Sequence, residues 1–220
     1  MILRVLPDGQ AELVMPRGGR AAEADAFLLA NQDWLIEEQH RILSVGAQRP
    51  VMLDLQGVGE QWRLDVREQP LRARPDRLLH GDAPDRFVLQ VFASDDDDEH
   101  VRKRVRARLI ERARAMFDDV LPPLASRMAS RFERIQVRAQ RTRWGSYSAS
   151  GTISLNYAVI FMPPAVVHYL CVHELAHYHH MNHGVGFWKL VERHAPGARR
   201  LDRELTRLQS TIPRWLLAIS

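Results

Sequence analysis

Short runs of alternating apolar and polar residues recur within roughly the first ninety positions, and this period of two is typical of strands with one buried face. Residues 3–6 and 11–15 flank the turn sequence Pro7-Asp8-Gly9 and predict a hairpin. Residues 61–66 and 87–92 alternate in the same way. Because proline and glycine separate the short runs between residues 50 and 93, we expect a small, mostly antiparallel sheet there.

Helical spacing of apolar residues marks a segment on either side of that sheet. Residues 21–41 predict one helix. Residues 95–99 form an acidic run, which is favourable near the partial positive charge of a helix N-terminus. A second helix is therefore expected over residues 99–121, where apolar side chains recur at four-residue steps.

Two pairs of prolines punctuate the second half of the chain. We expect Pro122 and Pro123 to interrupt the second helix, because proline removes a hydrogen bond inside a helix, with a further helical stretch to residue 130. Pro163 and Pro164 suit the first turn of a new helix, where no bond is lost. That helix is apolar on most sides, so it should be buried.

Two further strands are expected at residues 134–140 and 152–157, joined by a turn at Ser150-Gly151. The elements together predict an α+β protein. Residues 1–94 would form a β-rich part with one helix, and residues 95–220 a second part that carries the buried helix.

The composition is that of a globular protein of 220 residues. No apolar run is long enough to cross a membrane, and no signal peptide is evident, so we expect a cytoplasmic protein. The single cysteine, Cys171, excludes an internal disulfide and a multi-cysteine metal site. The net charge of +4 comes almost entirely from arginine and leaves a nucleotide or nucleic-acid partner possible.

The buried helix carries the sequence His173-Glu174-Leu175-Ala176-His177. Residues four apart share one face of a helix, so both imidazoles can reach the same ion. Glu174 projects about 100° around the helix, where it can act on the attacking water rather than bind the metal. This arrangement indicates a zinc hydrolase with Glu174 as the general base.

A catalytic zinc site needs a third protein ligand, and three residues are candidates. His180 lies on the same helical face but about 10.5 Å along the axis from His173, which is long for a shared ion. Glu192 is a further alternative. His183 is favoured because Asn182 and Gly184 flank it, and both types tolerate the conformation that ends a helix and turns the chain back. We expect the helix to end near Met181.

The stretch from residue 143 to residue 196 resembles the YgjP-like metallopeptidase family, which is related to the SprT/WLM group of zincins. Four blocks and a proline carry the resemblance: Arg143-Trp144-Gly145-Ser146, Ile153-Ser154-Leu155-Asn156, the motif at 173–177 with Asn182-His183-Gly184, and Phe187-Trp188 with Pro196. It implies a compact zincin-like fold with His173, His177 and His183 as zinc ligands and Glu174 as the base. The family usually has a cysteine where this chain has Tyr147.

A zinc metallopeptidase acting on a peptide or protein is the leading hypothesis. Its substrate would pair with an edge strand, for which residues 152–157 are the candidate, and Arg143, Asn156 and Tyr157 are the candidate substrate-binding residues.

Three other functions remain open. The resemblance also admits a nucleotide pyrophosphatase acting on UTP, which would recruit Arg138, Arg141 and Arg143, or a protease of DNA-bound protein like the SprT relatives. A non-enzymatic protein with a structural zinc is the third alternative. No obligate partner is evident from the sequence.

Overall fold

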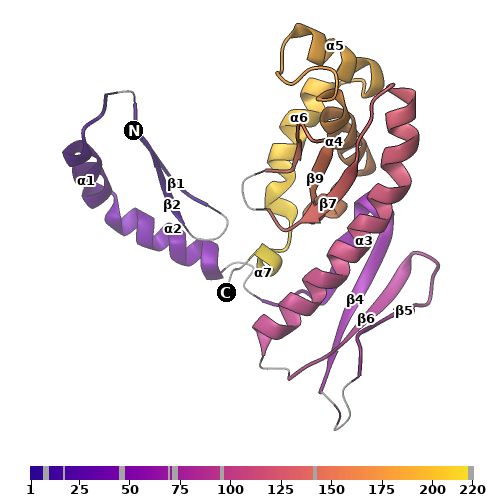
Figure 1. Cartoon of the computed structure of the whole chain (residues 1–220). Coiled ribbons are helices and arrows are strands. Elements are labelled where there is room, and N and C mark those ends of the chain that lie inside the picture. Colours follow the sequence, from indigo (N-terminus) through magenta and orange to yellow (C-terminus); the bar gives the residue numbers. More distant parts are fainter. Residues whose placement is uncertain are drawn as a thin grey trace. The chain divides into compact units, whose positions relative to one another are not determined.

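The computed structural model describes residues 1–6, 10–16, 18–44, 48–68, 70, 74–94, 97–140 and 143–217. The fold is mixed α+β, with small sheets and helices (Figure 1). The chain divides into two compact units, residues 1–50 with 212–220 (unit 1) and residues 51–211 (unit 2). The boundary expected at residue 94 does not coincide with this division and falls inside unit 2.

Unit 1 begins with the predicted hairpin, in which β1 (Ile2–Val5) pairs antiparallel with β2 (Ala11–Val14). The turn predicted at residues 7–9 lies outside the described residues. Where one helix was expected there are two, α1 (Ala21–Ala30) and α2 (Gln32–Ser44).

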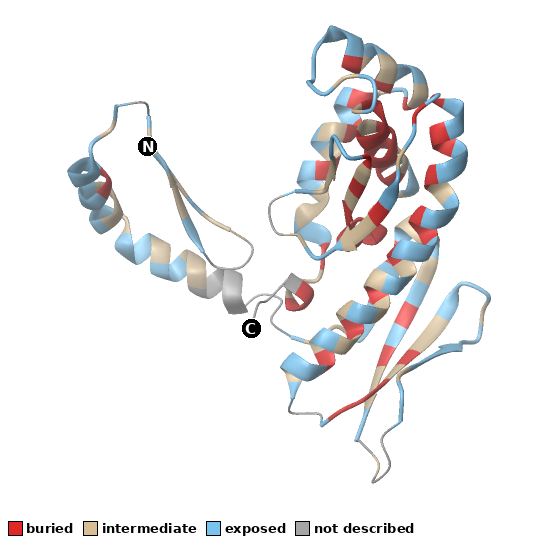
Figure 2. Cartoon of the chain, in the orientation of Figure 1, coloured by how far each residue is buried: buried red, intermediate tan, exposed pale blue. Residues whose placement is uncertain are grey.

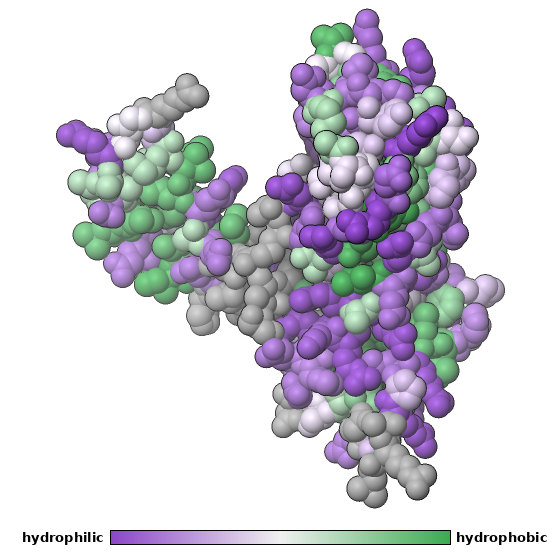
Figure 3. All heavy atoms as spheres, in the orientation of Figure 1, coloured by the Kyte–Doolittle hydropathy of each residue, from purple (hydrophilic) through white to green (hydrophobic). Residues whose placement is uncertain are grey.

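The break between α1 and α2 falls at Asn31. Its side-chain amide donates to the carbonyl of Phe27 at 2.8 Å, and its backbone leaves the helical region at φ −116° and ψ 15°. Asparagine competes in this way for local backbone groups, which explains why the helical pattern does not continue. Unit 1 also contains α7 (Arg214–Leu217), and the side chains of Leu29 in α1 and Ile36 in α2 are exposed. Figure 3 shows hydrophobic residues on the visible face of the part that holds α1 and α2.

The first sheet of unit 2 has the strand order β3-β4-β6-β5, and its strands are β3 (Met52–Leu55), β4 (Glu60–Arg67), β5 (Arg77–His80) and β6 (Arg86–Phe92). Two of its three pairings are antiparallel, as expected, but β4 and β6 run parallel. The short helix η1 (Gln56–Val58) joins β3 to β4. A side chain at Gly57 would lie 3.0 Å from Val167 and 3.1 Å from Ile160, so this sheet packs directly on the later helices.

A single long helix, α3 (Asp98–Arg127), follows the sheet. Asp97 caps it by accepting from the backbone of His100, consistent with the expected acidic start. The predicted interruption is wrong, since Pro122 and Pro123 lie within the helix. Both prolines are exposed, so the carbonyls that lose a partner can be solvated, while the next turn is anchored by buried Leu124.

Arginines on α3 connect it to both sheets of unit 2. Arg104 bonds Asp76 at 2.7 Å, and Arg112 bonds Glu60 on β4 at 2.7 Å. Arg114 donates to the carbonyl of Ile135 in the second sheet at 2.9 Å. These contacts on both sides explain why no compact unit ends near residue 94.

The second sheet has the order β7-β9-β8, with β7 (Arg134–Arg138), β8 (Gly145–Tyr147) and β9 (Thr152–Asn156). The turn at Ser150-Gly151 joins β8 to β9 and not, as predicted, β7 to β9. β7 and β9 run parallel, which a tight turn cannot connect. β9 is therefore the central strand, and the prediction that residues 152–157 form an edge strand is wrong.

The rest of unit 2 is helical, and buried residues are concentrated on its central helix α4 (Figure 2). The helices are η2 (Tyr157–Phe161), α4 (Pro164–Ala176), α5 (Val185–His194), α6 (Ala198–Arg207) and η3 (Leu208–Thr211). α4 packs against α3, α5, α6 and β8. Within the described part of the chain, no helix combines the length and apolarity needed to cross a bilayer.

Candidate metal centre

Helix α4 begins at the predicted proline pair, with Pro163 as N-cap and Pro164 in the first turn. It ends at Ala176, more than a turn before the Met181 that was predicted. The backbone N–H groups of His179 and His180 both donate to the carbonyl of Ala176, at 3.1 and 3.0 Å. The regular helix therefore passes into a turn over residues 177–179, and the chain reverses after this turn.

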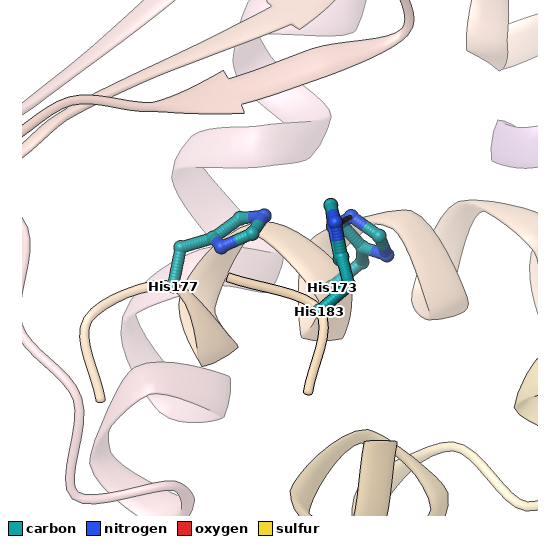
Figure 4. Close-up of side chains that lie close together, drawn as sticks. All are labelled: His173, His177 and His183. Carbon is teal, nitrogen blue, oxygen red and sulfur yellow. Dashed lines mark hydrogen bonds between the residues drawn. The ribbon is translucent and has the colours of Figure 1, made fainter. Parts of the chain in front are cut away.

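The reversal brings three imidazoles together. One nitrogen of each of His173, His177 and His183 lies within 4.8 Å of the other two. Figure 4 shows the three rings close together. His173 lies in α4, His177 is the C-cap of α4, and His183 lies in the loop that precedes α5. His180 does not belong to this group.

Hydrogen bonds hold the rings in place. Nδ1 of His177 lies 3.0 Å from the backbone carbonyl of His180, and since a carbonyl only accepts, Nδ1 carries the proton. Nδ1 of His173 lies 3.0 Å from the hydroxyl of Tyr169, which donates to Asp202 on α6 at 2.7 Å. The Nε2 atoms of His173 and His183 face each other at 3.1 Å.

Phe187, on α5, supports all three imidazoles from one side. It is fully buried, and its ring centroid lies 5.0, 4.8 and 4.6 Å from those of His173, His177 and His183. Phe187 belongs to a block that carries the family resemblance, but the sequence assigned it no role in the site. Its contact with three rings at once depends on how α5 folds back on α4, which helical spacing does not reveal.

Glu174 is buried beside this group, with 3% of its surface exposed, and its Oε2 has no hydrogen-bond partner among the described residues. Strand β8 passes so close that a Cβ at Gly145 would lie 2.7 Å from the carboxyl carbon of Glu174. Only glycine leaves room for the carboxyl group there, which accounts for the glycine in the Arg143–Ser146 block.

Burial dominates the electrostatics of the cluster. It raises the pKa of Glu174 to about 8, an effect that the charge of Arg143 opposes. Burial and the neighbouring His177 and His183 lower the pKa of His173 to about 4, and burial also lowers the pKa of His177. Both imidazoles are therefore neutral near pH 7, the form in which histidine binds a metal.

The candidate substrate-binding residues differ in their accessibility. Arg143 is exposed, and its charge acts on Glu174. Asn156 is buried and bonded on both sides, accepting from Ala158 and donating to the carbonyl of Gln140 at 2.7 Å. Tyr157 is 2% exposed. Because Asn156 and Tyr157 are buried, Arg143 is the only one of these three candidates with an exposed side chain.

Arg143 is also one of the three arginines suggested for phosphate binding. Arg138 is bonded to Gln136 on its own strand. Arg141 lies outside the described residues.

Two other residues singled out by the sequence have structural partners. Glu192, the alternative third ligand, accepts from the backbone N–H groups of Gly197 and Ala198 at 2.7 and 3.0 Å and so caps α6. Tyr147, which replaces the usual cysteine of the family, donates from its hydroxyl to the carbonyl of Arg131 at 3.0 Å.

The chain matches a family of known proteins. The model of the family described as "YgjP-like, metallopeptidase domain" matches residues 1–208. The protein is of the metallopeptidase class and belongs to the YgjP-like family, as the sequence indicated.

Two solved structures are similar to part of the chain. The metallopeptidase zymogen abylysin of Pyrococcus abyssi is 29% identical over 42% of this chain and 94% of its own, with a TM-score of 0.38. The metallopeptidase zymogen jannalysin of Methanocaldococcus jannaschii is 22% identical over 44% of this chain and 97% of its own, also with a TM-score of 0.38. The comparison with curated proteins finds no significant match.

Proposed function

We propose that this protein is a zinc-dependent peptidase in which His173, His177 and His183 hold the metal and Glu174 is the general base. The observation that carries the proposal is the grouping of three imidazole nitrogens within 4.8 Å beside a buried carboxyl group. Three histidines, with no fourth protein ligand in the group among the residues that the structure describes, are the donor set of a catalytic rather than a structural zinc site.

The donor atoms fit a metal ion. The Nε2 atoms of His173 and His183 are 3.1 Å apart, close to the roughly 3.3 Å that separates two nitrogens on a tetrahedral zinc. Two lone pairs at that distance repel unless a proton or a cation lies between them. Zinc, when bound, supplies Lewis acidity, which makes water more acidic and polarises the carbonyl under attack.

The protein's own contribution to the chemistry comes from Glu174. In the ionised form, which predominates above its pKa of about 8, the unpartnered Oε2 can accept the proton of the attacking water and then deliver it to the leaving amine. The buried position excludes bulk solvent from this carboxyl group, and β8 fixes it from one side.

The substrate would bind along β8, which takes the place of the strand expected at residues 152–157. β8 lies at the edge of its sheet and packs against α4. An extended peptide can add to such an edge as a further strand. Arg143, exposed at the start of this segment, is the proposed side-chain contact for an anionic group of the substrate.

The test uses the full chain and measures zinc content and hydrolysis together. We expect about one zinc per chain, with His183→Ala losing the metal and the matched control His180→Ala retaining it. The zinc-loaded protein should cleave members of a peptide or casein library and leave a parallel nucleotide panel intact. Full zinc occupancy in His183→Ala would refute the ligand set.

Hydrolysis of UTP without peptide cleavage would instead support the pyrophosphatase activity that the family resemblance admits. Cleavage confined to DNA-bound protein would point to the activity of the SprT relatives.

A further inference from the structure

A tyrosine and an aspartate connect α4 to α6 behind the imidazole cluster. Tyr169 precedes His173 by one helical turn, so both side chains lie on the same face of α4. Its hydroxyl is 3.0 Å from Nδ1 of His173 and 2.7 Å from Oδ1 of Asp202 on α6. Tyr169 is fully buried, so these two groups replace its contacts with water.

The direction of the two hydrogen bonds follows from proton counting. A tyrosine hydroxyl has one proton, and an ionised carboxylate can only accept, so the proton of Tyr169 lies in the bond to Asp202. The contact with His173 must then be a donation from Nδ1–H to the tyrosine oxygen. His173 is left with an unprotonated Nε2, the atom that faces Nε2 of His183.

Other contacts hold Asp202 in place. Glu192 caps the first turn of α6 through the N–H groups of Gly197 and Ala198. Leu201, the neighbour of Asp202, is buried, and α6 packs against both α4 and α5. The carboxylate is therefore carried by a helix that is fixed at its start and along one face.

We propose that Tyr169 and Asp202 are positioning residues that select the Nδ1–H tautomer of His173 and so direct its Nε2 lone pair into the metal site. The inference rests on the proposed function for the role of that lone pair. Partners of this kind, placed behind a metal-binding histidine, typically contribute tenfold to a hundredfold to metal affinity.

Two substitutions act on the pair in different ways. Tyr169→Phe removes both hydrogen bonds and leaves the tautomer of His173 unselected. Asp202→Asn preserves the shape, but its amide can donate to the tyrosine oxygen. The hydroxyl proton is then free to turn toward Nδ1 of His173, which favours the Nε2–H tautomer, in which Nε2 has no lone pair for a metal.

The first measurement is long-range ¹H–¹⁵N correlation NMR of the metal-free full chain, which reports the protonated nitrogen of each histidine ring. We expect His173 in the Nδ1–H form in the wild type and a shift toward Nε2–H in Asp202→Asn. Wild-type His173 in the Nε2–H form would overturn the proposal, whether or not the protein binds zinc.

The second measurement is zinc affinity by competition with a chelator. We expect Tyr169→Phe and Asp202→Asn to bind zinc about tenfold to a hundredfold more weakly. The control is Tyr147→Phe, which also loses one tyrosine hydroxyl bond to a neighbour but does not touch His173, and its affinity should be unchanged.

Wild-type affinity in both test variants would overturn the positioning role. A wild type that binds no zinc at all would refute the proposed function while leaving the tautomer measurement decisive for the pair. If Tyr169→Phe fails to fold, the wild-type spectrum and Asp202→Asn still decide the outcome.

Discussion

At the scale of single residues, the site depends on a carboxyl group that is buried without a full set of partners. A buried polar atom with no hydrogen bond destabilises a fold by about 1–3 kcal/mol, so Oε2 of Glu174 is costly unless a ligand or water completes it. Functional sites are where such costs are tolerated. Glu174 therefore stands out in the structure as clearly as it does in the sequence motif.

Replacing Glu174 with glutamine tests its role as the base. The amide has nearly the same shape but cannot take up the proton of the attacking water. We expect Glu174→Gln to fold and keep its zinc while the rate of peptide hydrolysis falls at least about a hundredfold. Turnover equal to the wild type, measured on the same substrate at equal zinc content, would rule this role out.

Gly145 should be equally sensitive, although it carries no chemistry. The methyl group of Gly145→Ala would press on the carboxyl group of Glu174 and displace it. Moving a reacting group by about 1 Å can lower a rate about a hundredfold. We expect kcat to fall on that scale with zinc content unchanged, because the three atoms nearest to the added methyl group all belong to Glu174. Retention of wild-type kcat would show that the carboxyl group has room to relax.

At the scale of elements, the short strand β8 provides the sheet edge that is proposed to bind the substrate. Its ladder with β9 is marked by hydrogen bonds from Asn156 N–H to the carbonyl of Trp144 and from Ser148 N–H to the carbonyl of Thr152. In an antiparallel pair the bonded residues alternate, so the backbone groups of Gly145 and Tyr147 point away from β9. These groups are the ones that an added substrate strand would use.

A proline at this open edge separates the role of the backbone from that of the side chain. Tyr147→Pro removes one N–H from the outer edge without removing a bond to β9, and Tyr147→Ala removes only the side chain. One hydrogen bond contributes about 0.5–1.5 kcal/mol, so KM for an extended peptide should rise about threefold to tenfold in the proline variant relative to the alanine variant. Equal KM values in steady-state assays would argue against strand addition at β8.

At the scale of the whole molecule, metal binding should appear as stability. A ligand that binds only the folded state at a hundred times its Kd stabilises a protein by about 2.7 kcal/mol. For a chain of this size that corresponds to a rise in Tm of roughly 5–10 °C. We expect calorimetry to show this rise on adding zinc to the chelator-treated protein.

Calorimetry of the His183→Ala variant with and without zinc is the control for this prediction. Without the third imidazole the zinc-dependent rise in Tm should largely disappear, while the metal-free Tm changes little because His183 is exposed. A rise of the same size in this variant would mean that the stabilising ion binds elsewhere.

The spacing of residues along the chain was enough to propose the three metal ligands and to predict most of the helices and strands. His173 and His177 are one turn apart on a helix whose start Pro164 marks, and the hairpin near the N-terminus follows from alternation. These signals depend on the period of the helix or strand, which is a property of neighbouring residues. The family resemblance could also be found in the sequence, because each of its motif blocks is a short run of consecutive residues.

Only the tertiary structure decided which distant segments meet. The sequence of β9 does not show whether this strand pairs with one neighbour or with two. The prediction therefore placed it at the sheet edge, whereas it lies between β7 and β8. Phe187 and Asp202 reach the cluster only because α5 and α6 fold back on α4. Such pairings depend on burial and hydrogen bonding across long sequence separations, which leave no periodic trace in the amino-acid sequence.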